Sequence, residues 1–216
     1  MIRREDKMER ISVIKKIMIA GAFAASSAVM LTACSGGGTG TTTESKAKIA
    51  DTLSSYPKSD MSGYEGLQGY DKETVFVDMT VQDVKKEMDN KSTFVFFASY
   101  ATCPYCNKLI PYLNDVALEE GVKVGYIDTR KNPEWKSNMD IDDYDLFVEM
   151  FGDYLKLDEN EKKHLYVPHT FFIKNGEVVY SHEGVADNLE DPKGELSEDM
   201  KESIRNAVRE GFDKMR

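Results

Sequence analysis

The sequence is poor in cysteine and tryptophan, and it lacks an apolar run long enough to span a membrane comfortably. Its 216 residues include three cysteines and one tryptophan, Trp135. A membrane helix needs about 20 apolar residues, and the apolar stretch from Ile17 to Ala33 is shorter than that. These scarcities argue against a scaffold of structural disulfides and against a membrane-spanning helix.

Positive charge is also scarce. The chain has 28 lysines and arginines against 38 aspartates and glutamates, and its net charge is −10. A surface this acidic repels phosphate backbones, which argues against nucleic acid as a partner. It also repels anionic lipid headgroups, so a membrane association is expected to hold the folded part away from the bilayer.

Six lysines and arginines do gather at the N-terminus, before the apolar stretch. This order is typical of a secretory signal peptide, with Met1, Met8 or Met18 as the start. The stretch ends in Leu31-Thr32-Ala33-Cys34, which resembles the lipobox of bacterial lipoproteins. The resemblance implies cleavage before Cys34 and lipid attachment to its sulfur; the alternative is an ordinary signal peptide with a stray cysteine.

We therefore expect three parts. Residues 1–33 are the signal peptide, and residues 34–73 are the lipidated cysteine, a flexible linker and an irregular N-terminal extension. Residues 74–216 are the folded domain. The removed segment has six basic against three acidic residues, so processing would change the net charge from −10 to −13.

The two remaining cysteines stand together in FASYATCPYCNK, as Cys103 and Cys106. Three interpretations are open: a redox pair, half of a metal site, or two small apolar residues without a chemical role. Structural zinc needs four ligands, and the three histidines (His164, His169 and His182) lack ligand-like spacing, so no metal site is predicted. A two-thiolate copper(I) site stays open. Outside the cytoplasm the pair would meet an oxidising environment.

Hydrophobic periodicity predicts alternating strands and helices. Extended runs occupy 74–77, 93–98, 122–128, 169–173 and 177–182, and helical patterns occupy 81–88, the segment from the cysteines to Gly121, and 197–215. A charged segment with an apolar stripe, about 132–165, reads as a helical insertion. The order β-α-β-α-β, insertion, β-β-α indicates an α/β sandwich.

Several of these features together resemble the thioredoxin-like superfamily, including the bacteriocin-transport accessory proteins. The resemblance is carried by the strand before Cys103-Pro104-Tyr105-Cys106, by Val167-Pro168 entering a strand, by the turn Lys174-Asn175-Gly176-Glu177, and by Asp128 and Gly184. It implies a thioredoxin-like three-layer α/β sandwich, with the helical insertion placed before the cis-proline strand.

The resemblance also implies roles for single residues. Cys103 would be the attacking thiolate, favoured by the N-terminus of a helix, and Cys106 would resolve the mixed disulfide. Pro168 would be cis and would present the backbone of Val167 to an extended substrate. Residues that shape the groove or tune the pKa would be Pro104, Tyr105, Val167 and His169.

The chain departs from the thioredoxin pattern near the cysteines. Phe97 stands where thioredoxins have a buried aspartate that relays a proton to the deeper cysteine, so another group or water must do so here. His169 follows Pro168 directly. Either its imidazolium lies near Cys103 and lowers the pKa of that thiol, or the side chain faces solvent without a catalytic role.

The sequence predicts a membrane-tethered, extracytoplasmic thiol–disulfide oxidoreductase that needs no cofactor. Its partners would be protein thiols and disulfides, an unidentified redox partner, and the bacterial cell membrane through the lipid on Cys34. Two alternatives remain: a non-catalytic thioredoxin-like lipoprotein whose insertion docks a partner, and a copper(I)-handling lipoprotein. The sequence does not indicate whether the protein oxidises, reduces or isomerises its substrates.

Overall fold

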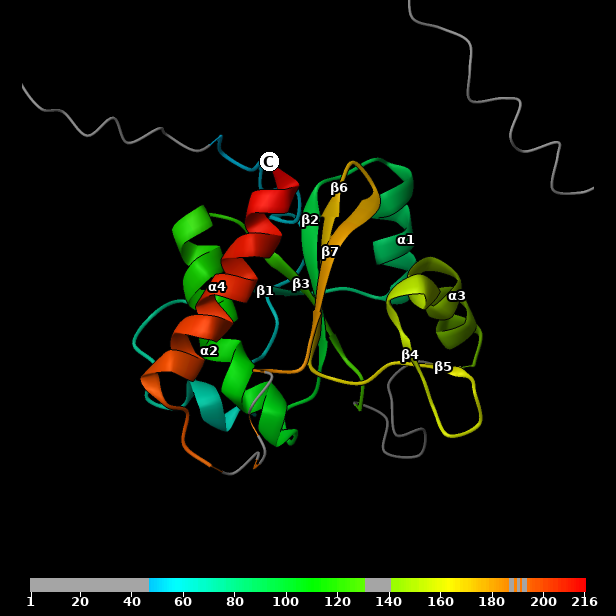
Figure 1. The fold of residues 1–216 in the computed structure, drawn as a ribbon. Coiled ribbons are helices and arrows are strands. Elements are labelled where there is room, and N and C mark those ends of the chain that lie inside the picture. The colour runs from blue at the N-terminus through cyan, green and yellow to red at the C-terminus, as the bar shows by residue number, and fades with distance from the viewer. Residues whose placement is uncertain (1–46, 131–140, 187–188, 190, 192–193) are drawn as a thin grey trace, which may run out of the picture. The chain divides into compact units, whose positions relative to one another are not determined.

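A five-stranded sheet lies between two layers of helices (Figure 1). The computed structural model describes residues 47–130, 141–186, 189, 191 and 194–216, so the predicted signal peptide, Cys34 and Trp135 lie outside the described residues. The strand order is β1-β3-β2-β6-β7. The strands are β1 (Phe76–Asp78), β2 (Phe94–Ser99), β3 (Val124–Asp128), β6 (His169–Lys174) and β7 (Glu177–Glu183).

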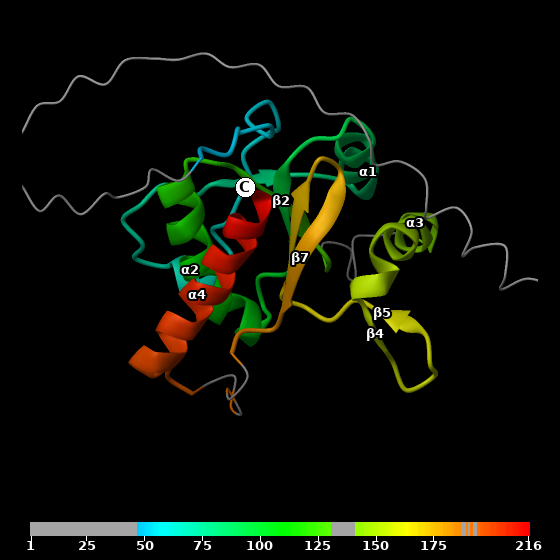
Figure 2. The ribbon, with the colours of Figure 1, turned by 45° about the horizontal axis from the view of Figure 1, so that its top comes forward.

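Strands β1, β3 and β2 pair in parallel, whereas β6 and β7 run antiparallel to their neighbours. Helices α2 (Pro104–Glu120) and α4 (Glu198–Met215) cover one face of the sheet, and α1 (Val81–Asp89) and α3 (Ile141–Phe151) cover the other (Figures 1 and 2). We call these the cysteine face and the far face. This is the thioredoxin-like α/β architecture that the sequence predicted.

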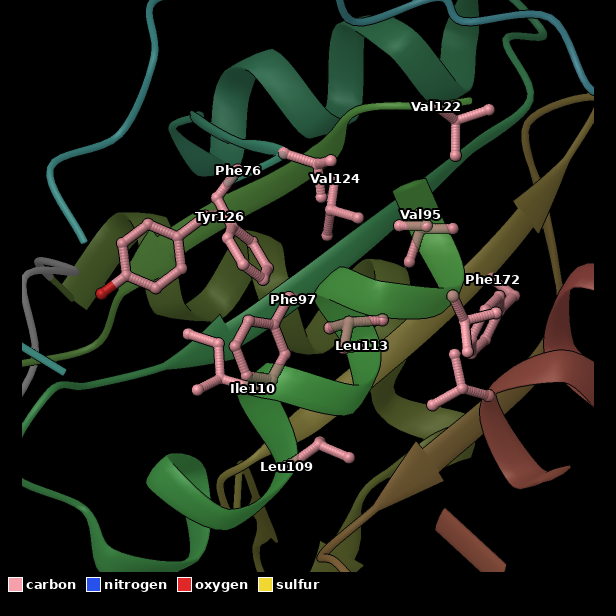
Figure 3. Packing of buried hydrophobic residues seen from close by; sticks show 14 of the residues in the cluster. Phe76, Val95, Phe97, Leu109, Ile110, Leu113, Val122, Val124, Tyr126 and Phe172 are labelled. Atoms are coloured by element: carbon pink, nitrogen blue, oxygen red, sulfur yellow. The ribbon is translucent and has the colours of Figure 1, made fainter. Parts of the chain in front are cut away.

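Strand β2 is the centre of the sheet, and all six of its residues are buried. Its side chains alternate, so Val95 and Phe97 pack on the cysteine face while Phe94, Phe96 and Ala98 pack on the far face. Figure 3 shows the cysteine-face core around Phe97. A strand buried on both sides explains the nearly continuous apolar run that predicted it.

Local signals place the ends of the elements. Thr80 and Asp83 form a capping box at the start of α1, and Ser197 caps α4 through the backbone N–H of Met200. Gly121 ends α2 with a φ of 71°, a backbone conformation that glycine adopts without a steric penalty. The hairpin between β6 and β7 turns at Asn175 and Gly176, as predicted.

The segment predicted as a helical insertion, 132–165, contains helix α3 in the part that the structure describes. Helix α3 lies across the far face, where Phe147 and Phe151 are fully buried against Phe96 and Phe171. The helix is therefore one of the layers of the fold. Only the short hairpin of β4 (Lys156–Leu157) and β5 (Lys163–His164) forms a separate two-stranded sheet.

The described residues before Thr74, which were predicted to be part of the N-terminal extension, form one compact unit with the domain. Extended backbone at Lys58 pairs with Val77 at the edge of the sheet, and the N–H of Ser59 donates to the carbonyl of Phe76 at 3.0 Å. The short 3-10 helix η2 (Glu65–Leu67) packs on α2. Four apolar side chains of the segment are buried: Ile49, Leu53, Met61 and Tyr64. The segment is irregular, as expected, but it belongs to the core.

Candidate active site

Cys103 is the N-cap of α2, at the point where the chain leaves the central strand. Its sulfur accepts a hydrogen bond from the backbone N–H of Cys106 at 3.3 Å. Pro104 follows at the first helical position, where its missing N–H costs nothing. The helix therefore directs its unpaired N–H groups, and the positive end of its dipole, at the Cys103 sulfur.

These contacts lower the pKa of Cys103 from its ordinary value of 9.0 to about 7. The largest cause is a hydrogen bond from the Cys106 thiol, and the backbone N–H groups of Cys106 and Tyr105 and the Tyr100 hydroxyl add to it. Burial opposes the shift, since it disfavours the charged thiolate. The thiolate form of Cys103 is thus more accessible at neutral pH than that of an ordinary cysteine.

Cys106 lies one turn deeper and is completely buried, whereas 3% of Cys103 is exposed. Burial is the main cause that raises the pKa of Cys106 far above its ordinary value, and its interaction with Cys103 adds to the shift. A hydrogen bond with Ser99 acts in the opposite direction. Both cysteines are free thiols in this structure. The pair therefore combines a reactive sulfur near solvent with a protonated sulfur below it.

The predicted groove residues lie around Cys103. The Val167–Pro168 peptide bond is cis, as predicted, and the Cys103 sulfur lies 3.9 Å from the carbonyl oxygen of Val167. Pro168 is buried, and its carbonyl accepts a hydrogen bond from the N–H of Gly184 at 2.9 Å. Tyr105 and Val167 are half-buried and Pro104 is exposed.

Neither interpretation of His169 holds in the structure. Its side chain is fully buried and stacks on Phe171, with 4.1 Å between ring centroids, on the far face of the sheet. Burial, with smaller contributions from the positive charges of His182 and Lys156, lowers the pKa of His169 to about 3. A neutral imidazole on the opposite side of the sheet cannot stabilise the Cys103 thiolate. The error has a simple cause: alternation along β6 decides the face, and the sequence distance from Pro168 does not.

Sequence reasoning missed the polar groups that do touch the cysteines. The Tyr100 hydroxyl helps to lower the pKa of Cys103, and the guanidinium of Arg130 lies 4.1 Å from the centroid of the Tyr100 ring. Ser99 acts on the pKa of Cys106 and hydrogen bonds to Tyr64, which comes from the N-terminal segment. A serine at the end of a buried strand, within FASY, was a signal that could have been read. Tyr64 had no such signal.

The described residues also bear on metal binding and on the membrane. Among them, no group of three or more His, Cys, Asp or Glu side chains could hold a metal ion. Within the same part of the chain, no helix is both long enough and apolar enough to cross a membrane.

Comparison with solved structures returns thioredoxin-fold proteins. Thioredoxin O2 from Arabidopsis thaliana is 19% identical and has a TM-score of 0.34, and the match covers 52% of this chain and 84% of that one. Thioredoxin from Trypanosoma brucei brucei is 14% identical and has a TM-score of 0.39, with 67% and 96% covered. No family model and no curated protein sequence matches the chain. At this level of similarity, function has to be argued from the site itself.

Proposed function

We propose that the protein is a thiol–disulfide oxidoreductase that works through Cys103 and Cys106. The observation that carries the proposal is the asymmetry of the pair: the pKa of Cys103 is lowered to about 7, and the pKa of the buried Cys106 is raised. The geometry agrees with this asymmetry: Cys103 caps helix α2 close to the cis Val167–Pro168 bond, and Cys106 is buried one turn below it. The thiolate is the attacking species in disulfide exchange, and an attacking thiol works best when its pKa is near the ambient pH.

In the reducing direction, the Cys103 thiolate attacks one sulfur of a substrate disulfide. The substrate S–S bond breaks, its electron pair stays on the second substrate sulfur, and that sulfur takes a proton. Cys106 then loses its proton and attacks the Cys103 sulfur of the mixed disulfide. The Cys103–Cys106 bond forms, the first substrate sulfur leaves as a thiol, and the pair is oxidised by two electrons. The oxidising direction is the reverse.

The redox equilibrium of the pair against glutathione tests the proposal. Thiols are trapped at each glutathione ratio, and mass spectrometry of the peptides with Cys103 and Cys106 gives the oxidised fraction without interference from Cys34. We expect a reversible two-electron couple. A reduction potential of about −270 mV would indicate a reductase. A reduction potential of about −120 to −180 mV would indicate an oxidase or isomerase.

Two single variants separate the roles of the cysteines. Cys106→Ser should keep the attacking thiolate and accumulate mixed disulfides, whereas Cys103→Ser should lose exchange almost entirely. If the wild-type disulfide neither forms nor exchanges, the proposal fails. If a Cys103→Ser/Cys106→Ser double variant keeps the biological function, the protein is an accessory binding module.

We further propose that the enzyme acts outside the cytoplasm, tethered to the bacterial cell membrane through a lipid on Cys34. Support comes from the sequence Leu31-Thr32-Ala33-Cys34 after a basic and apolar leader. More than one acyl chain makes a stable anchor, at about 0.8 kcal/mol for each buried CH₂. Cys34→Ala should release the protein from the membrane fraction or block its processing. Cys103→Ser is the matched control, because it removes a thiol without touching the lipid acceptor, and a Cys34→Ala variant that is processed and anchored normally would contradict the proposal.

A further inference from the structure

A chain of buried hydroxyl groups leads away from the deeper cysteine on the cysteine face. Ser99 lies beside Cys106 and acts on the pKa of its thiol, the Ser99 and Tyr64 hydroxyl oxygens lie 2.7 Å apart, and the Tyr64 hydroxyl donates to that of Tyr126 at 3.1 Å. The three hydroxyl residues come from three separate parts of the chain: β2, the N-terminal segment and β3. All three residues are buried.

Cys106 needs such a path if the proposed function is right. It must lose a proton before it can attack the mixed disulfide, and a fully buried thiol has no direct contact with water. In the described part of the chain no aspartate or glutamate is buried, and none is among the groups named as shifting the pKa of Cys106. The Phe97 side chain, at the place where thioredoxins have their aspartate, offers only an apolar ring.

We propose that Ser99, Tyr64 and Tyr126 form the proton relay of Cys106, an inference that rests on the proposed oxidoreductase function. Ser99 is the catalytic residue of the relay because it touches the reacting thiol. Tyr64 and Tyr126 act through Ser99 and are positioning residues. The relay takes the place of a buried carboxylate, and one of its members belongs to the segment before residue 74.

The donors and acceptors of the chain are consistent with one direction of transfer. Tyr64 donates to Tyr126, so the hydrogen between Ser99 and Tyr64 comes from Ser99. In the reduced pair the Cys106 thiol donates to the Cys103 sulfur. Once that sulfur is bonded to substrate it is no longer a thiolate, and we assign the S–H of Cys106 to the Ser99 oxygen at this stage. In the resolving step each hydroxyl takes one proton and passes one on. The proton of Cys106 is thereby exchanged for the proton of Tyr126, which leaves to water while the departing substrate sulfur takes a proton from water.

The outer end of the relay lies near negative charge. Tyr126 is 6% exposed, and the carboxylates of Asp128 and Asp78 act on its hydroxyl. Asp128 is half-buried and Asp78 is exposed, so this end of the relay lies toward solvent. A proton that arrives at the Tyr126 hydroxyl is thus attracted outward.

The aromatic rings of the relay are held by packing that does not depend on their hydroxyl groups. The rings of Tyr64 and Tyr126 meet edge to face at 6.2 Å, and the Tyr126 ring lies 6.4 Å from that of Phe76 and 6.3 Å from that of Phe97. Figure 3 shows Tyr126 beside these two phenylalanines on the cysteine face. A tyrosine-to-phenylalanine change therefore removes the hydroxyl and keeps the core.

Ellman's disulfide reagent provides the test, because one reaction reports both steps. The reduced full-length protein with Cys34 blocked by its lipid should release thionitrobenzoate in two phases. The first phase is the attack of Cys103 on the reagent, and the second is the attack of Cys106 on the mixed disulfide. Ser99→Ala should slow the second phase on the order of a hundredfold near neutral pH and leave the first unchanged.

The variants also have to separate proton transfer from structure. Tyr64→Phe and Tyr126→Phe should slow the second phase by smaller factors, and Ser99→Thr, which keeps the hydroxyl, should restore most of the rate. In Ser99→Ala the second phase should gain a steep rise with pH, because hydroxide then has to remove the proton. Tyr56→Phe is the matched control, since its hydroxyl binds Glu87 at 2.8 Å, away from the cysteines.

The outcomes distinguish the two proposals. A wild-type protein that shows no second phase would overturn the oxidoreductase function and the relay with it. A wild type with two phases whose Ser99→Ala and Tyr64→Phe variants resolve at the same rate and with the same pH profile would overturn the relay alone. A slowed second phase that Ser99→Thr fails to restore would assign Ser99 a purely structural role and also overturn it.

Discussion

Both faces of the central sheet bury polar side chains, and the polar groups beside the cysteines differ from the histidine on the far face. On the cysteine face the hydroxyls of Ser99, Tyr64 and Tyr126 bind one another and reach Cys106. On the far face His169 is equally buried, but neither of its ring nitrogens has a hydrogen-bond partner among the described residues. The difference teaches that burial alone does not mark a functional group. The connected set lies beside the reactive sulfurs, and the unconnected residue lies among phenylalanines.

The contrast also predicts how each face responds to pH. A buried polar group without a partner destabilises the fold, and it does so most when it becomes charged. The far face should therefore decide how stability depends on acid. The cysteine face should decide how reactivity depends on pH, because its ionisable groups are held in defined hydrogen bonds.

The largest effect should come from a change in the apolar packing of the far face. Phe151→Ala should lower the free energy of unfolding by about 3–5 kcal/mol, because the buried ring packs closely against two others. Its ring centroid lies 4.3 Å from that of Phe171 and 4.8 Å from that of Phe147. Urea unfolding followed by circular dichroism measures it. Leu157→Ala in the neighbouring hairpin is the matched control, since that side chain is 54% exposed. Equal, small effects of the two changes would show that α3 is an appendage after all.

A smaller effect is expected from the unpartnered histidine. The pKa of His169 is 6.5 in the unfolded chain and about 3 in the fold, so the unfolded state binds more protons between these values. Stability should fall as the pH drops below 6.5 and should stop falling near pH 3. The loss attributable to His169 at pH 5 is about 2 kcal/mol.

His169→Leu should remove this part of the pH dependence and make the protein more stable at pH 5. Thermal or urea unfolding between pH 5 and pH 8 measures the slope. His164→Leu is the matched control for the substitution itself, because His164 is an exposed histidine. An unchanged slope in His169→Leu would mean that the ring already has a proton or a partner in solution.

The smallest effect should come from the cysteine face, at Tyr100. Its hydroxyl helps to lower the pKa of Cys103, and Arg130 lies over its ring. Tyr100→Phe should raise the pKa of Cys103 from about 7 by roughly one unit or less, since one partly exposed hydrogen bond is lost. The rate of iodoacetamide labelling of Cys103 against pH measures it. Tyr105→Phe should change little, because Tyr105 acts on Cys103 through its backbone N–H.

Much of the fold could be predicted from the sequence because its signals are local. The buried run of β2, the capping box at Thr80, the stop at Gly121 and the turn at Asn175-Gly176 each act within a few residues. The packing of helix α3 could not be predicted, because a helix with an apolar stripe has the same sequence pattern whether it covers a sheet or docks elsewhere. The apolar stripe that contains Phe147 and Phe151 does not indicate which surface it packs against.

The candidate site divides in the same way. The cysteines, Pro104 and the cis Val167–Pro168 bond were predicted because they lie in short motifs. The environment of each group was not, because it depends on residues far away in the chain. Tyr64 is 35 residues from Ser99 and 62 from Tyr126, and nothing in its local sequence marks it as a partner of either.

The sequence by itself determined the reactive pair and the order of the strands and helices, because CxxC spacing and hydrophobic period are properties of neighbouring residues. Only the tertiary structure decided which face of the sheet each polar group occupies. It placed His169 away from the cysteines, and it brought a tyrosine of the N-terminal segment into contact with Ser99. The physical reason is that pKa values and proton paths depend on burial and on distances of a few ångströms, which arise only when distant segments pack together.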